Sequence, residues 1–234
     1  MKVEVEQGKT LSPLSLRRAV FLDRDGVINR IVYDSEFGLV DSPQNAEQFQ
    51  PLPGVGEAIR LINEMGFLTA VVSNQPGIAK GKSTPSILEE VTRKMHRLLA
   101  ESGARLDAVY YCLHHPEALL EEYRVICDCR KPKPGLLQKA AREWGIDLQA
   151  SYVIGDGLTD IEAGQTVGCT TLWIGRAKCE ICKVMGEKMV FPHFIASTLL
   201  EAVKIIKKKE FGDGDLSGYI KPCGDRKVVG PRRH

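Results

Sequence analysis

The sequence predicts an α/β fold in which a parallel sheet carries helices on both faces. Apolar, partly β-branched runs such as 67–72 show no polar alternation, which is typical of strands covered on both faces. Segments with helical periodicity, such as 54–65, separate these runs along the chain. Polar residues follow several of the runs directly. Because open α/β sheets bind ligands outside the carboxyl ends of their strands, we expect a functional site at that edge.

The composition fits one globular domain with one core. The chain has 234 residues, of which 43% are hydrophobic and 26% are charged, and its formal net charge is +2. So small a charge creates no general attraction for nucleic acid or anionic membranes. No apolar run approaches the ~20 residues that span a bilayer, and no secretory leader is evident. We therefore expect a cytoplasmic protein without nucleic-acid or membrane partners.

Three regions are expected along the chain. Residues 1–18 are polar and mixed, and they predict an N-terminal arm. Residues 19–208 carry the alternating strands and helices and form the domain. Residues 209–234 are rich in Lys, Gly and Asp, a composition that favours a flexible C-terminal tail.

The first predicted strand ends in two carboxylates, Asp23 and Asp25, followed by Gly26. Alternation places both side chains on the same side of an extended backbone, where they repel unless a cation lies between them or one holds a proton. Mg²⁺, which prefers carboxylates, water and phosphate, fits that need. The alternative is a solvated turn with an Asp at each end.

The next 23 or so residues, 30–52, predict a loop, and loops of more than about 15 residues are usually binding elements or lids. A surface insertion is the equal alternative. A helix over 54–65 should stop at Gly66, and the strand 67–72 should follow.

Ser73 and Asn74 end that second strand, and Pro76 then turns the chain away. The hydroxyl of Ser73 can donate to a phosphate oxygen, whereas the same residues also describe an ordinary turn. Lys80 and Lys82 are expected to be solvated. Thr84 and Pro85 predict the start of a helix that ends near Gly103.

A third strand, 108–111, runs into two close pairs of metal-binding residues. Zn²⁺ prefers four thiolate or imidazole ligands in a tetrahedron, and structural sites often combine two short-spaced pairs. The alternative is four unrelated buried side chains. His115 is a less favoured substitute for the neighbouring histidine. The predicted zinc ligands are Cys112, His114, Cys127 and Cys129.

Arg130 and Lys131 follow the last of these cysteines, so zinc would hold the loop that carries them. Arg can contact phosphate with two nitrogens, and Lys supplies a point charge beside a transferring phosphoryl group. A basic turn before a helix is the equal alternative. The helix 135–144 should end at Gly145.

Another strand reaches Asp156, which can complete a cation site with Asp23 and the backbone carbonyl of Asp25. Asp160 lies on the helix that follows, where it either orients Lys131 or the waters of the metal, or stabilises the helix N-terminus. Further strands are predicted at 170–174 and 189–191, and a last helix at 197–208.

Cys179 and Cys182 form one more close pair. With Cys223 or His193 they could build a second metal site, and the favoured alternative is a pair of incidental thiols.

The pattern D-x-D-G after a strand resembles the first motif of the haloacid dehalogenase superfamily. Between about 21 and 174, the stretches SNQPGIAKG and CRKPKPG and the Cys/His cluster narrow the resemblance. They are similar to the D-glycero-D-manno-heptose 1,7-bisphosphate 7-phosphatase family and, more distantly, to the histidinol-phosphate phosphatases. The resemblance implies a Rossmann-like sheet without a large cap domain, a zinc-stapled loop that is part of a small lid, and a phosphatase domain over 19–208.

The resemblance also implies roles for individual residues. Asp23 would be the nucleophile, Asp25 the general acid and base, and Asp156 the third Mg²⁺ contact. Ser73 and Lys131 would hold the phosphoryl group, and Asn74 and Arg130 would touch the substrate. Two positions depart from the family pattern, since Gly157 stands where a Lys is usual and Pro76 where a Ser is common.

The resulting expectation is a monomeric, Mg²⁺-dependent phosphatase that acts on a small phosphorylated sugar through an aspartyl-phosphate. Hydrolysis of histidinol phosphate or of another small phosphorylated metabolite is the alternative within enzymes. An inactive, zinc-stapled binding module is the alternative from another class.

Overall fold

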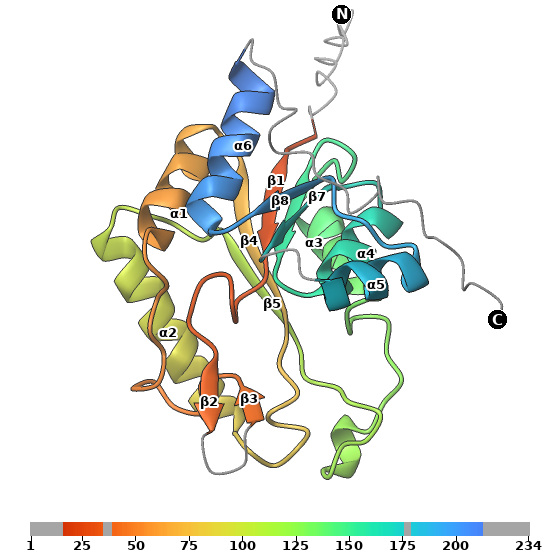
Figure 1. The fold of residues 1–234 in the computed structure, drawn as a ribbon. Coiled ribbons are helices and arrows are strands. Elements are labelled where there is room, and N and C mark those ends of the chain that lie inside the picture. The colour runs from red at the N-terminus through yellow and green to blue at the C-terminus, as the bar shows by residue number, and fades with distance from the viewer. Residues whose placement is uncertain (1–15, 35–38, 176–178, 213–234) are drawn as a thin grey trace, which may run out of the picture.

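Six parallel strands form the central sheet of the computed structural model, which describes residues 16–34, 39–175 and 179–212. Their spatial order is β5-β4-β1-β6-β7-β8, so the chain moves outward from β1 first to one side and then to the other. All the carboxyl ends therefore meet at one edge (Figure 1). The strands are β1 (Ala19–Leu22), β4 (Leu68–Asn74), β5 (Ala108–Cys112), β6 (Tyr152–Gly155), β7 (Thr170–Ile174) and β8 (Phe194–Ala196).

Helices cover both faces of this sheet (Figure 1). Val20 and Leu22 pack into the larger core with α1 (Val55–Glu64), α2 (Pro85–Glu101) and α6 (Leu199–Phe211). Ala19 and Phe21 point to the other face and pack with α3 (Gly135–Trp144) and α4 (Leu158–Thr166). All four residues of β1 are fully buried, so β1 is a central strand without a polar face.

The helix boundaries follow local chemistry. Thr84 accepts a hydrogen bond from the backbone N–H of Ile87 (3.2 Å), and Pro85 occupies the first helical position of α2. Gly145 ends α3 in the left-handed region, at φ 62°. The predicted start of α2 and the predicted end of α3 are both confirmed.

Three sequence predictions were wrong in detail. The predicted loop 30–52 contains an antiparallel pair, β2 (Val32–Asp34) and β3 (Leu39–Asp41). The predicted strand 189–191 lies instead between α5 (Cys179–Lys188) and β8, where Met189 has φ 53° and Val190 packs against Trp173. The apolar residues there fill a small core and do not pair with a strand. The last helix also extends beyond 208, to Phe211.

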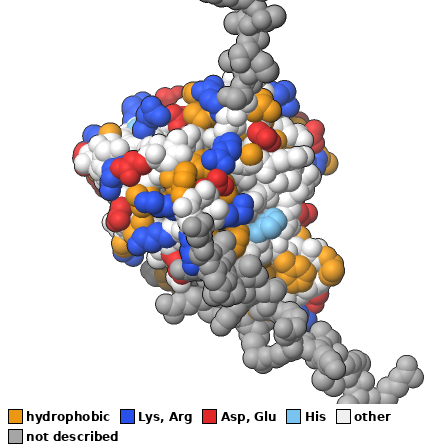
Figure 2. Space-filling view, turned by 90° about the horizontal axis from the view of Figure 1, so that it is seen from above, with side chains coloured by type: hydrophobic (Ala, Val, Ile, Leu, Met, Phe, Trp, Pro, Cys, Tyr) orange, Lys and Arg blue, Asp and Glu red, His pale blue; other side chains and the backbone are white. Residues whose placement is uncertain are grey.

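The predicted arm 1–18 and tail 209–234 fall mostly outside the described residues. None of the described helices is both long enough and apolar enough to cross a bilayer. Acidic and basic side chains are intermixed on the face seen in Figure 2, as the small net charge leads one to expect.

Candidate active site

A pocket of about 420 Å³ opens at the carboxyl edge of the sheet. It lies over the ends of β1, β4 and β6, which are neighbours in the sheet, so residues far apart in the chain meet there. It brings together six of the residues predicted from sequence, together with residues of the β2–β3 hairpin and the loop after β4. Its lining residues are Asp23, Asp25, Ile31, Asp41, Ser42, Ser73, Asn74, Pro76, Lys80, Lys82, Arg130 and Asp156.

Three carboxylates, Asp23, Asp156 and Asp160, place one oxygen each within 4.8 Å of one another. We call them the carboxylate cluster. Gly26 allows this close approach, because a β-carbon at that position would lie 1.9 Å from Oδ2 of Asp156, and its φ of +79° disfavours any side chain. The turn after Asp25 therefore requires glycine.

The carboxylate cluster fits a hard divalent cation. Burial and the neighbouring charge of Asp23 raise the pKa of Asp156 to about 7, which means that its ionised form is costly without a cation nearby. Oxygen ligands of this kind suit Mg²⁺. The side chain of Asp25, by contrast, does not belong to the carboxylate cluster, so a metal contact from this residue would use its backbone carbonyl.

Lys131 is the buried counter-ion of the carboxylate cluster. Its Nζ lies 3.0 Å from Oδ1 of Asp23, donates to the carbonyl oxygen of Val72 (2.9 Å) and contacts Asp160 directly. Burial alone would lower the pKa of Lys131, but Asp160 and Asp23 outweigh it and raise that pKa. Lys131 therefore stays protonated. The structure shows both alternative roles for Asp160, since it pairs with Lys131 and its Oδ2 also accepts from the backbone N–H of Gly157 (3.1 Å) at the start of α4.

Asp25 accepts hydrogen bonds from four side chains. Oδ1 accepts from Nδ2 of Asn29 (2.9 Å), and Oδ2 accepts from Oγ of Ser42 (2.8 Å) and Nε2 of Gln75 (2.7 Å). Arg24, which is fully buried, contacts both oxygens through Nη2 at 3.0 Å. These donors fix the position of the Asp25 side chain beside the pocket.

Two more predicted residues belong to the wall of the pocket. Asn74 forms two hydrogen bonds with the backbone of Lys131. Its Oδ1 accepts from the N–H of Lys131 (3.0 Å), and its Nδ2 donates to the carbonyl oxygen of Lys131 (3.1 Å). Arg130 donates from Nη1 to the carbonyl oxygen of His114 at 3.3 Å. Asn74 thus ties the basic loop to the end of β4, in addition to facing the pocket.

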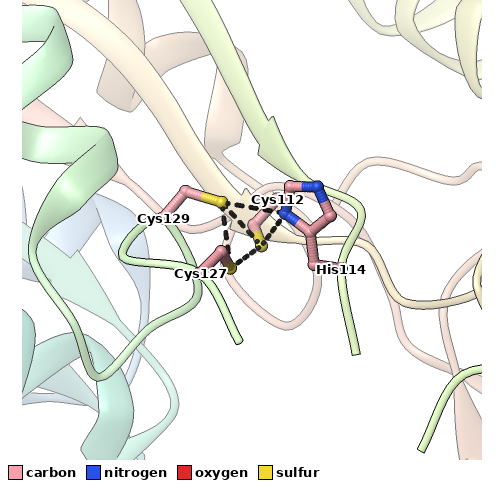
Figure 3. A group of neighbouring side chains, drawn as sticks. All are labelled: Cys112, His114, Cys127 and Cys129. Carbon is pink, nitrogen blue, oxygen red and sulfur yellow. Dashed lines mark hydrogen bonds between the residues drawn. The ribbon is translucent and has the colours of Figure 1, made fainter. Parts of the chain in front are cut away.

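Cys112, His114, Cys127 and Cys129 form the thiol cluster (Figure 3). Cys112 ends β5, and the other three come from the loop that follows. Sulfur–sulfur distances are 3.1 Å, 3.2 Å and 3.6 Å, and Nδ1 of His114 lies 3.3 Å from the sulfur of Cys129. His115 is not in the cluster, since its Nδ1 accepts from the backbone N–H of Glu117.

These distances fit a tetrahedral zinc site. Four ligands about 2.3 Å from a central ion would be separated by roughly 3.7 Å, slightly more than most of the distances seen here. The three cysteines form no disulfide, so their sulfurs can bind a metal as thiolates. With all four positions supplied by the protein, such a site would hold the loop and leave no open position for chemistry.

No second metal cluster forms around Cys182 among the described residues. Cys182 is disulfide-bonded, and Nδ1 of His193 accepts from the backbone N–H of Thr171 at 3.0 Å. The side chain of Cys179 and Cys223 lie outside the described residues.

The β2–β3 hairpin closes one side of the pocket. Asp41, at the end of β3, forms an ion pair with Lys82 at 2.5 Å, which joins the hairpin to the loop after β4. Lys82 was predicted to be solvated, and in the structure its side chain is partly exposed but forms this ion pair. Lys80 and Lys82 both line the pocket. Of the two alternatives for the segment 30–52, this arrangement favours a binding element.

Sequence reasoning missed the four side chains that bind Asp25, which are Arg24, Asn29, Ser42 and Gln75. Arginine is usually exposed, and alternation in an extended strand would point Arg24 away from its acidic neighbours. Ser42 lies in a segment read as a loop. Gln75 offered one signal, its place beside Ser73 and Asn74 at a strand end, but its partners could not be inferred from that place.

Comparison with known proteins finds similarity over most of the chain. The HAD-hydrolase-like family model matches residues 128–202. The D-glycero-beta-D-manno-heptose-1,7-bisphosphate 7-phosphatase of Escherichia coli (strain K12) is 46% identical over 192 residues, which cover 82% of this chain and 95% of that protein. The Salmonella typhi protein of the same name is 42% identical over 192 residues, with 82% and 96% covered.

Solved structures show the same relation. The D,D-heptose 1,7-bisphosphate phosphatase from B. bronchiseptica, complexed with magnesium and phosphate, has a TM-score of 0.66 and 27% identity, covering 82% of this chain and 99% of that one. The corresponding enzyme from Burkholderia thailandensis has a TM-score of 0.55 and 26% identity, with 81% and 98% covered.

Proposed function

Because the chain belongs to the D-glycero-beta-D-manno-heptose-1,7-bisphosphate 7-phosphatase family of HAD-like hydrolases, we propose that it removes the 7-phosphate of that sugar bisphosphate. The observation that carries the proposal is the pairing of Asp23 with a buried Lys131 at a pocket that also holds Asp25, Ser73 and Asp156. This is the set of groups that an aspartate nucleophile and a phosphoryl group require.

Asp23 is the proposed nucleophile. One of its carboxylate oxygens forms a bond to phosphorus while the bond from phosphorus to the sugar oxygen breaks, which leaves an aspartyl-phosphate. A water molecule then forms a new bond to phosphorus, the bond to Asp23 breaks, and inorganic phosphate leaves. Oδ1 of Asp23 is held by Lys131 and by the backbone N–H of Arg24 (2.7 Å), which fixes the carboxylate for in-line attack.

Asp25 is the proposed general acid and base. In the first half it gives a proton to the leaving sugar oxygen, and in the second half it takes a proton from the attacking water. Ser42 suits both states, because a hydroxyl can donate to a carboxylate and accept from a carboxylic acid.

Asp23, Asp156 and the backbone carbonyl of Asp25 would hold Mg²⁺, as the oxygen-rich carboxylate cluster suggests. The ion supplies positive charge that offsets the charge on the phosphoryl oxygens. Lys131 supplies a second charge there, and Ser73 a hydrogen-bond donor. Arg130 and Asn74 face the same pocket and are the proposed substrate contacts.

The thiol cluster is the proposed zinc site, with Cys112, His114, Cys127 and Cys129 as ligands. Its loop leads directly to Arg130 and Lys131, so an ion there would limit the positions that these two cations can take. Metal analysis of the purified protein should find one zinc per chain, and a protein without zinc would contradict this assignment.

Phosphate release from three substrates tests the function. The purified protein with Mg²⁺ should hydrolyse the β-heptose 1,7-bisphosphate with higher kcat/KM than the α-anomer or histidinol phosphate. A preference for histidinol phosphate would overturn the substrate assignment. No phosphate release from any of the three would favour a binding module.

The proposed active unit is a single chain. The proposal is supported by the presence of Asp23, Asp25, Ser73, Arg130 and Asp156 of the same chain in one pocket. Light scattering should give a mass near 25.9 kDa, and a stable dimer would contradict the proposal.

A further inference from the structure

Gln75 occupies a central place that the proposed reaction does not yet explain. It is buried, with 4% of its surface exposed, and it lies just beyond the end of β4. Its side chain contacts Arg24, Asp25 and Ser73. We propose that Gln75 is a positioning residue, held in one orientation by Arg24, which directs the hydroxyl hydrogen of Ser73 toward the phosphoryl group.

The orientation of the Gln75 amide has one solution. Its Oε1 accepts from Nη2 of Arg24 at 2.9 Å, and its Nε2 donates to Oδ2 of Asp25 at 2.7 Å. A guanidinium can only donate, and a carboxylate can only accept. Reversing the amide would put an NH₂ group against the guanidinium and an oxygen against the carboxylate, so both contacts would become repulsive.

This orientation determines what Ser73 can do. Nε2 of Gln75 also donates to Oγ of Ser73, at 3.1 Å, and that oxygen is therefore an acceptor toward Gln75. The hydroxyl has one hydrogen, which remains available for another acceptor. Ser73 lines the pocket beside Asp23, so the free hydrogen is placed to serve a phosphate oxygen there.

Arg24 is the anchor of this arrangement. It is fully buried, its Nη2 serves both Asp25 and Gln75, and its guanidinium carbon lies 5.6 Å from the ring centroid of Tyr111. A single buried charge thus fixes both the proposed acid/base and the amide that orients Ser73. The chain of contacts runs from Arg24 through Gln75 to Ser73.

The inference rests on the proposed role of Ser73 in phosphate binding, and a double-mutant cycle tests the coupling directly. The four proteins are wild type, Gln75→Met, Ser73→Ala and the double variant. Methionine is similar in length and uncharged, but it gives no donor. The measurement is the affinity for inorganic phosphate in the presence of Mg²⁺, by calorimetry.

Gln75→Met should weaken phosphate binding by about fivefold to tenfold in the wild-type background, the effect of one lost hydrogen bond to a charged group. In the Ser73→Ala background the same change should alter the affinity by less than about twofold. Equal losses in the two backgrounds, or no loss in either, would overturn the proposal.

Gln75→Glu is the second variant, for use if Gln75→Met does not fold as judged by circular dichroism. It keeps an oxygen facing Arg24 and removes the donor to Ser73. Because the added negative charge weakens anion binding in both backgrounds, the proposal predicts a larger loss of phosphate affinity when Ser73 is present than in Ser73→Ala, and equal losses would overturn it.

Asn63→Leu is the matched control. Its amide also donates to a hydroxyl, that of Thr69 at 3.0 Å, and neither residue lines the pocket. It should leave phosphate affinity unchanged. Inorganic phosphate reports on the site whichever sugar is the substrate, so a failed heptose assay would overturn the proposed function and leave this inference standing.

Discussion

The carboxylate cluster and the thiol cluster are both suited to a cation, but they are assembled differently. Asp23, Asp156 and Asp160 come from segments that meet only because β1 and β6 are neighbours in the sheet. Cys112 and Cys129 are 17 positions apart, and all four members of the thiol cluster lie in or next to one loop. One cluster depends on the whole fold, whereas the other depends on one segment.

The two clusters also differ in how completely the protein satisfies the groups they contain. The carboxylate cluster lies beside an open pocket, and one buried lysine, Lys131, faces its three carboxylates, so its charges are only partly balanced by protein groups. The thiol cluster supplies a complete set of ligands. We infer that unbalanced charge belongs to the site that performs the reaction, and that the thiol cluster holds its loop in place. Four predictions test this division.

Asp23→Asn should have the largest effect. An amide cannot form the aspartyl-phosphate, so kcat should fall by about 10⁴-fold or more, while zinc content and thermal stability stay close to wild type. Initial-rate kinetics and metal analysis check this. Turnover within tenfold of wild type would show that another group is the nucleophile.

Lys131→Met should reduce both activity and stability. Removing the buried amine leaves the carboxylates of Asp23 and Asp160 without their partner, at a cost of about 3–5 kcal/mol in the free energy of unfolding. Loss of the charge beside the phosphoryl group should also lower kcat by about 10²–10³-fold.

Lys133→Met is the control for this prediction. Lys133 is half-exposed and pairs at the surface with Asp128, so its loss should change stability by less than about 1 kcal/mol. Urea denaturation of both variants measures the difference. Similar losses in the free energy of unfolding for the two variants would mean that the buried ion pairs of Lys131 stabilise the fold no more than the surface pair of Lys133.

Cys127→Ser should have an intermediate effect that acts through the loop. We expect loss of zinc, a lower melting temperature, and a decrease in kcat/KM of about tenfold, because Arg130 and Lys131 become less restricted. Cys169→Ala, a change at a buried free thiol outside the cluster, should keep the zinc. Zinc loss without any change in kcat/KM would show that the zinc-bound loop does not affect catalysis.

The pH dependence of stability should reveal the smallest effect. The pKa of Asp156 is about 7 in the metal-free protein and about 4 when unfolded, so between these values the folded state binds more protons. This carboxyl therefore opposes folding increasingly as the pH rises from about 4 to 7. Added Mg²⁺ should restore stability at pH 8 more than at pH 5.

Asp156→Asn isolates this contribution. The melting temperature of the variant, in buffer without Mg²⁺, should fall less than that of wild type between pH 5 and pH 8, and Mg²⁺ should raise it little. Parallel curves for the two proteins would show that another group is responsible.

The parts of the molecule that sequence reasoning found share a local origin. Helix α3 ends at the glycine that predicts its end, Gly145, and the thiol cluster follows from the spacing of four residues in one segment. Strand ends carrying Asp23, Ser73 and Asp156 could be located because a parallel sheet aligns its carboxyl ends. Local spacing and strand direction can be predicted from sequence without knowing which segments become neighbours in the fold.

Errors and omissions arose where the outcome depends on long-range packing. The apolar residues at 189–191 cover a small core and form no strand, while β8 lies a few residues later at the sheet edge. The sequence predicts a loop where the structure has the hairpin that brings Ser42 to Asp25, since two strands of three residues are too short for a periodic signal.

Sequence alone determined which chemistry is available here: carboxylates at strand ends, a basic loop, and thiols in a metal-binding pattern. Only the tertiary structure decided how these groups are oriented. It buries Arg24, turns the Gln75 amide, ties Asn74 to Lys131 and pairs Lys131 with Asp160. The physical reason is that hydrogen-bond direction and desolvation are properties of the neighbours a side chain meets, and those neighbours come from segments distant in the chain.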